Sequence, residues 1–172
     1  MSAKVKASAM SFNVVDVFVQ VFNDLFSFLD FDHKFMSEVP ESSLNSTEKI
    51  NTLIGVTGDI EGNIMFCFSE KTAEELIKVL TGKREVKEID FYAKAALTDF
   101  FSEFATRFSE LTKIANMNDV DSKIKEYTVL TSDPTYISGD GLYGMISKVP
   151  SRKIFFKLNG ERFGIAYSLA QK

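Results

Sequence analysis

The sequence is poor in the residues that make covalent and metal cross-links. It has one cysteine and one histidine among 172 residues, no tryptophan, nine glycines and three prolines. A single cysteine cannot form an internal disulfide, and one histidine leaves too few ligands for a structural zinc site or a histidine-rich metal centre. The low glycine and proline content, with 45% hydrophobic and 26% charged residues, excludes a disordered or fibrous chain.

Long hydrophobic runs and an excess of basic residues are also missing. The most apolar segment near the N-terminus, Val14 to Leu29, is interrupted by acidic and amide side chains, whereas a membrane span needs about twenty mostly apolar residues. Residues 1–10 lack the apolar stretch of a signal peptide. The net charge of −4 argues against a nucleic-acid binder, which must neutralise phosphates. We therefore expect a cytoplasmic protein with neither a membrane nor a nucleic-acid partner.

The length fits one domain, which we place at residues 12–170, preceded by an N-terminal extension over 1–11. Phenylalanine is the one enriched residue, with 17 copies. A core filled with phenylalanine rings is the first interpretation, and a cavity that holds a small ligand is the alternative.

Three segments have the hydrophobic period of helices. The first is 13–29, and the second is 72–81, with Thr72 and Glu75 as a capping box and Gly82 as its C-terminal stop. The third is long, from about Asp90 to Ala115. Its apolar residues fall on one line of the helix and predict a buried stripe: Leu97, Phe101, Phe104, Phe108, Leu111 and Ala115.

The other segments read as strands and turns. A polar loop over 30–49, with a possible short strand near 34–38, precedes a hairpin whose turn is 58–62. Its second strand is apolar on both faces, which predicts a central place in the sheet and a buried Cys67. Asn159-Gly160 is a strong signal for a second hairpin. The predicted strands are 50–57, 63–68, 125–131, 134–138, 142–149, 153–158 and 162–169. This order predicts an α+β fold, a two-layer sandwich with a mostly antiparallel sheet and helices packed on one face.

Common catalytic motifs are absent from the sequence, including a nucleophile elbow and a phosphate-binding glycine-rich loop. His33 has no second histidine to share a metal and reads as a surface or loop residue. The polar side of the long helix carries short side chains in one stripe, which would let another protein approach closely. An ordinary solvated helix face is the alternative. The stripe consists of Ala95, Asp99, Ser102 and Thr106, flanked by Glu103, Glu110 and Lys113.

Residues 55–69, with the sequence GVTGDIEGNIMFCFS, resemble the CheX branch of the CheC/CheX chemotaxis phosphatases. That family shares a Gly-x-Thr-Gly-x-x-x-Gly hairpin, an apolar strand and the helix that follows, here with Thr72 and Gly82. Residues 133–139, DPTYISG, resemble the Pro-Thr-x-x-x-Gly segment that follows the family's long helix. The resemblance covers about residues 12–170.

The resemblance implies that the protein removes a phosphoryl group from an aspartate of a CheY-like response regulator. CheX-like proteins use a Glu-x-x-Asn pair on the long helix: the Glu engages a lysine of the regulator, and the Asn amide orients the attacking water. They need no cofactor of their own, because the regulator holds the magnesium. They often pair their sheets edge to edge, so the resemblance also implies a homodimer.

The sequence departs from the family at this pair, where Asp99 and Ser102 stand in place of Glu and Asn. Asp is one methylene shorter than Glu, and a Ser hydroxyl lacks the combined acceptor and donors of an amide. We therefore take Asp99 and Ser102 as candidate catalytic residues, and Ala95, Glu103 and Thr106 as candidate partner-binding residues. Glu103 with Thr106 is a second pair of an acid and a hydroxyl at the same spacing. Three functions stay open: a divergent phosphatase, an inactive binding or scaffold module, and a phenylalanine-lined small-ligand sensor.

Overall fold

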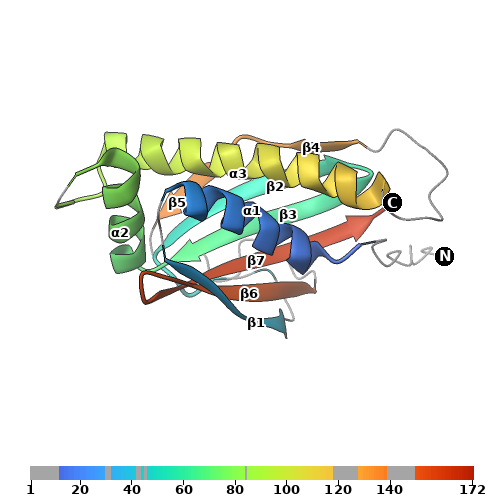
Figure 1. The fold of residues 1–172 in the computed structure, drawn as a ribbon, viewed down its shortest axis with the longest axis horizontal. Coiled ribbons are helices and arrows are strands. Elements are labelled where there is room, and N and C mark those ends of the chain that lie inside the picture. Colours follow the sequence, from blue (N-terminus) through green and yellow to red (C-terminus); the bar gives the residue numbers. More distant parts are fainter. Residues whose placement is uncertain are drawn as a thin grey trace.

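The computed structural model describes residues 12–29, 32–41, 44, 46–83, 85–117, 128–138 and 150–172. The predicted strand 142–149, the first residues of the predicted strand 125–131 and the extension 1–11 lie outside these residues, so the division into 12–170 and 1–11 stays a prediction. Figure 1 shows the elements in chain order. They are α1 (Val14–Phe28), β1 (His33–Glu41), β2 (Ile50–Gly58), β3 (Ile60–Phe68), α2 (Glu70–Thr81), α3 (Phe91–Met117), β4 (Val129–Thr131), β5 (Thr135–Ser138), β6 (Ser151–Leu158) and β7 (Glu161–Gln171).

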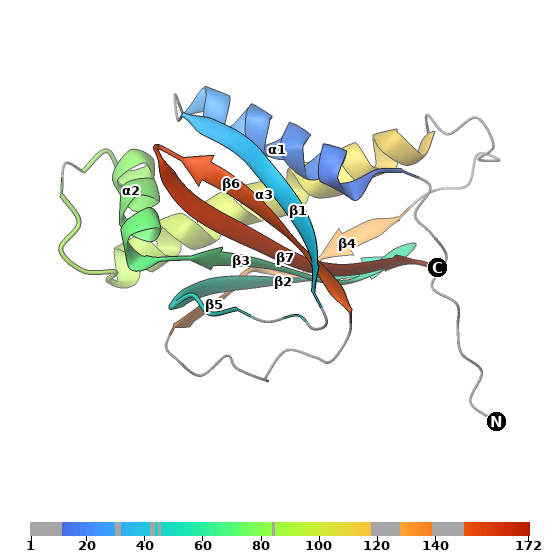
Figure 2. The same ribbon diagram turned by 90° about the horizontal axis from the view of Figure 1, so that it is seen from below.

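The strands form one antiparallel sheet in the order β1-β6-β7-β3-β2-β4, and β5 also pairs with β2. β3 lies between β7 and β2, as its two apolar faces predict. The long helices α1 and α3 lie together over one face of the sheet, and α2 packs at one end (Figure 2). The predicted α+β, two-layer architecture is confirmed.

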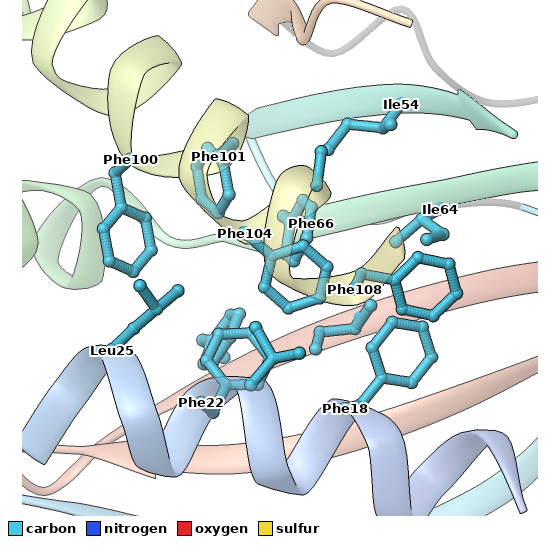
Figure 3. Packing of buried hydrophobic residues seen from close by; sticks show 14 of the residues in the cluster. Phe18, Phe22, Leu25, Ile54, Ile64, Phe66, Phe100, Phe101, Phe104 and Phe108 are labelled. Atoms are coloured by element: carbon cyan, nitrogen blue, oxygen red, sulfur yellow. The ribbon is translucent and has the colours of Figure 1, made fainter. Parts of the chain in front are cut away.

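Phenylalanine rings fill the space between the helices and the sheet (Figure 3). Phe104 of α3 is fully buried, and its ring centroid lies 5.0 Å from that of Phe22 in α1 and 4.8 Å from that of Phe66 in β3. Rings at such separations attract each other beyond the effect of area burial alone. This is the phenylalanine core that the composition predicts. On the other face of the sheet, Cys67 is buried in a small hydrophobic cluster. This burial raises the pKa of its thiol.

The second predicted hairpin is confirmed. Asn159 and Gly160 join β6 to β7 with φ angles of 46° and 85°, the left-handed backbone that this dipeptide tolerates. The partners Ile154 and Ile165 face the core from the two strands, as their alternation predicts.

The first hairpin is tighter than predicted. β2 runs to Gly58 and β3 begins at Ile60, so most of the expected turn 58–62 is strand. Gly62 is paired with β7, has a φ of 143°, and a Cβ there would lie 1.8 Å from the Ser168 carbonyl oxygen. Glycine is needed at this position for a close approach of two strands and not for a turn.

Two other boundaries differ from the prediction. The segment expected as a loop with a short strand at 34–38 holds the nine-residue strand β1. Most β1 side chains are exposed, so the sequence lacks the alternation that marks a strand. His33 begins β1, half-buried, with Nε2 2.8 Å from the Asn23 Oδ1 atom.

Helix α2 begins earlier than its predicted capping box. Its N-cap is Ser69, whose Oγ accepts from the Thr72 backbone N–H at 3.1 Å, and Thr72 is buried within the first turn of the helix. Gly82 ends the helix in left-handed backbone, as predicted. None of the helices in the described part of the chain is long and apolar enough to cross a membrane.

Candidate functional site

The long helix α3 is held over the sheet by its apolar face. It begins after Asp90, whose carboxylate accepts from the Ala93 backbone N–H at 2.9 Å and satisfies one of the free donors of the first turn. The inner face follows the predicted stripe, of which four members are buried and Leu111 and Ala115 are partly buried against the core. The opposite face is therefore turned away from the sheet.

One flank of α3 is attached to the short strands at the sheet edge. The Ser109 hydroxyl donates to the Val129 carbonyl of β4 at 2.6 Å, and the Lys94 ammonium lies 5.2 Å from the ring centroid of Tyr136 in β5. Burial raises the pKa of Tyr136, and the negative charge of Glu70 adds to this effect. α1 lies along the other flank (Figure 1). These supports fix the helix in place, which a positioning site needs.

The outward face of α3 carries all five residues that the sequence singles out. Asp99, Glu103 and Thr106 are exposed, and Ala95 and Ser102 are partly exposed. At about 100° per residue, Asp99 and Ser102 lie within about 60° of each other on the helix surface. The structure thus brings the acid and the hydroxyl together on a solvent-facing surface.

The two pairs of an acid and a hydroxyl differ in their hydrogen bonds. Glu103 accepts from the Arg107 guanidinium at 2.8 Å, and the Thr106 hydroxyl donates to the Ser102 carbonyl at 3.1 Å. Within the described residues, no hydrogen bond or ion pair engages the side chains of Asp99 and Ser102. Asp99 can therefore meet a cation of a partner, and the Ser102 hydroxyl can donate to or accept from water.

Sequence reasoning passed over Arg107, which competes with any partner for the Glu103 carboxylate. The signal was available, because acid and base four residues apart meet on a helix surface. Among the described residues, no group of three or more histidine, cysteine, aspartate or glutamate side chains could hold a metal ion.

Comparison with known proteins gives one curated relative and a set of similar structures. No protein-family model matches the chain. The "CheY-P phosphatase CheX" of Thermotoga maritima is 26% identical over 114 residues, which are 63% of this chain. The match spans 66% of that relative, just under two thirds of its length.

The similar solved structures cover nearly the whole fold. A chemotaxis protein CheX from Desulfovibrio desulfuricans has a TM-score of 0.73 and 19% identity, over 91% of this chain and 98% of that one. CheX from Vibrio vulnificus has a TM-score of 0.71 and 14% identity, over 91% and 98% of the two chains. A CheX-CheY-BeF3-Mg complex from Borrelia burgdorferi has a TM-score of 0.65 and 16% identity, over 92% and 96%.

Proposed function

We propose that this chain, a CheX-like member of the CheC/CheX family, acts on a CheY-like response regulator through the outward face of α3. The Thermotoga maritima relative is a phosphatase of phosphorylated CheY, and the similar CheX from Borrelia burgdorferi was solved in complex with CheY. One observation supports the same partner here. Asp99 and Ser102 lie on the solvent-facing side of α3, and within the described residues neither side chain has a hydrogen-bond or ion-pair partner.

The proposed reaction is hydrolysis of the aspartyl phosphate on the regulator. A water oxygen attacks the phosphorus, the bond from phosphorus to the aspartate oxygen breaks, and inorganic phosphate and the free carboxylate result. Asp99 engages a lysine of the regulator, and the Ser102 hydroxyl hydrogen-bonds the attacking water. The regulator holds the magnesium ion, so this chain supplies positioning alone.

The experiment mixes the full chain with CheY-like receiver domains of its own organism, phosphorylated by a small phosphodonor. We expect the protein to shorten the half-life of the phosphorylated receiver. Asp99→Ala and Ser102→Ala each return the decay to within about twofold of the spontaneous rate, because a positioning reaction loses roughly a hundredfold with a lost or displaced contact. Phosphate release measures the rate.

Asp16→Ala is the matched control, because it removes an exposed carboxylate from the neighbouring helix α1 and leaves the outward face of α3 intact. It should leave the accelerated decay unchanged. Binding of the phosphorylated receiver without any change in its decay would reject the phosphatase and favour the alternative, an inactive scaffold module in two-component signalling.

We propose a homodimer on separate grounds. β1 forms one edge of the sheet over nine residues, and no strand in the described part of the chain pairs with its outer side, whereas β2 is covered at the other edge by β4 and β5. An uncovered edge presents unpaired backbone donors and acceptors to a second chain. Sedimentation equilibrium should give twice the chain mass of 19.3 kDa. A wild-type monomer at all concentrations would reject the dimer.

A further inference from the structure

The beginning of α3 carries two large aromatic side chains on the surface. Phe91 is 78% exposed and Tyr92 is 73% exposed, and their ring centroids lie 5.8 Å apart. Neither ring belongs to the core cluster or packs against it. Aromatic residues are also weaker helix formers than alanine. Neither core packing nor helix propensity accounts for this pair.

A third exposed aromatic lies at the same end of the helix layer. Phe28, 89% exposed, is the last residue of α1. Two residues earlier, Phe26 stacks on Phe100 of α3 at 5.6 Å, so the end of α1 lies beside the first turns of α3. These three side chains are the most exposed large hydrophobic residues in the described part of the chain. Exposed aromatic side chains that lie against each other, as Phe91 and Tyr92 do, mark interaction sites more often than scattered ones do.

The aromatic pair continues the proposed docking face. Tyr92 precedes Asp99 by seven residues, so the two lie within about 20° on the helix surface and about 10 Å apart along it. Phe91 precedes Ser102 by eleven residues, again within about 20° and at about 16 Å. An interface of ordinary size, about 800 Å² on each partner, covers such a span.

Phe91 and Tyr92 supply the apolar contact area that the rest of the outward face of α3 lacks. Ala95, Ser102 and Thr106 have short side chains that allow close approach but bury little area, and Asp99 is a charge. Partner interfaces gain most of their affinity from a few aromatic anchors. We propose that Phe91 and Tyr92 are the apolar anchor that holds the response regulator against α3, an inference that rests on the proposed function. The partner that binds this surface is the receiver domain of the regulator. The aromatic pair contacts that domain next to its phosphorylated aspartate.

The test measures the accelerated decay of the phosphorylated receiver against the concentration of the full chain. In the double variant Phe91→Ala/Tyr92→Ala we expect the half-saturating concentration to rise about ten- to a hundredfold, with the decay rate at saturation unchanged. Phe91→Leu/Tyr92→Phe, which keeps apolar area, should recover most of the affinity. Ile114→Ala is the control, an exposed apolar residue 53% exposed near the other end of the same helix.

Each outcome decides between the two proposals. An unchanged half-saturating concentration in the double variant, while Asp99→Ala abolishes the acceleration, overturns the aromatic anchor and leaves the proposed function intact. A loss of the saturated rate would place the pair in the reaction and not in docking. If the double variant changes the sedimentation mass but not the receiver titration, the pair is a contact between copies of this chain. Should the wild-type chain neither bind nor affect any receiver, the proposed function fails, and this inference with it.

Discussion

Phe104→Ala should lower the free energy of unfolding by about 3–5 kcal/mol. Phe104 is fully buried, and its ring meets those of Phe18 and Phe22 in α1, Phe66 in β3 and Phe108 in its own helix (Figure 3). Removing it leaves a cavity at the point where two helices and the sheet meet. Surrounding rings that are stacked on one another cannot all move to fill it. Urea denaturation followed by circular dichroism measures the loss.

Two variants control for the chemistry of this change. Phe104→Leu keeps most of the apolar volume and should lose clearly less stability than the alanine variant. Phe91→Ala deletes the same ring from an exposed position of the same helix and should change the free energy of unfolding by less than about 0.5 kcal/mol. Equal losses for Phe104→Ala and Phe91→Ala would contradict the packing described for α3.

The core of this fold could be predicted from the sequence because its apolar residues recur with the period of the helix or strand that carries them. Leu97, Phe101 and Phe108 recur on one face of α3, and all are buried. In the same way, the alternation in β6 and β7 and the Asn159-Gly160 turn identify the closing hairpin. The local sequence pattern is enough to predict an element when one of its faces is buried and the other is exposed to solvent.

The parts that sequence could not give depend on contacts between distant segments. β1 has no buried alternation, and it is a strand because the backbone of β6 pairs with it. Gly62 looks like a turn glycine until the chain brings Ser168 of β7 against it. Ser69 and Thr72 are both good cap residues, and only the packing of Thr72 into the interior selects Ser69 as the N-cap.

The outward face of α3 follows from sequence for the same reason as the core, since it is the opposite side of the same helix. Which acid would meet the proposed response regulator does not follow from the sequence, because Asp99 and Glu103 are one turn apart and both exposed. The hydrogen bonds distinguish them: Glu103 is engaged by Arg107, whereas Asp99 has no partner in the described chain. On this ground we propose Asp99 and Ser102 as the reacting pair.

Restoring the family's side chains at this pair should raise activity. We expect Asp99→Glu/Ser102→Asn to accelerate decay of the phosphorylated receiver about a hundredfold over the wild-type chain, because the longer acid and the amide recover about 1 Å of reach and a second hydrogen-bonding group. All the changed side chains lie on the outward face, so the fold should be unaffected. Single-turnover phosphate release at saturating protein measures the step free of binding.

Thr106→Asn provides the competing test with one substitution, since it creates a Glu-x-x-Asn pair with Glu103. We expect it to stay within about threefold of the wild-type rate, because Arg107 holds the Glu103 carboxylate at 2.8 Å and a new partner must displace it. Thr106→Asn combined with Arg107→Ala removes that competitor.

A hundredfold gain in either Thr106→Asn variant, with none in Asp99→Glu/Ser102→Asn, would move the reacting pair one turn along α3 to Glu103 and position 106. A gain in neither pair, with the receiver still bound, would mean that this surface docks the regulator without the geometry for hydrolysis.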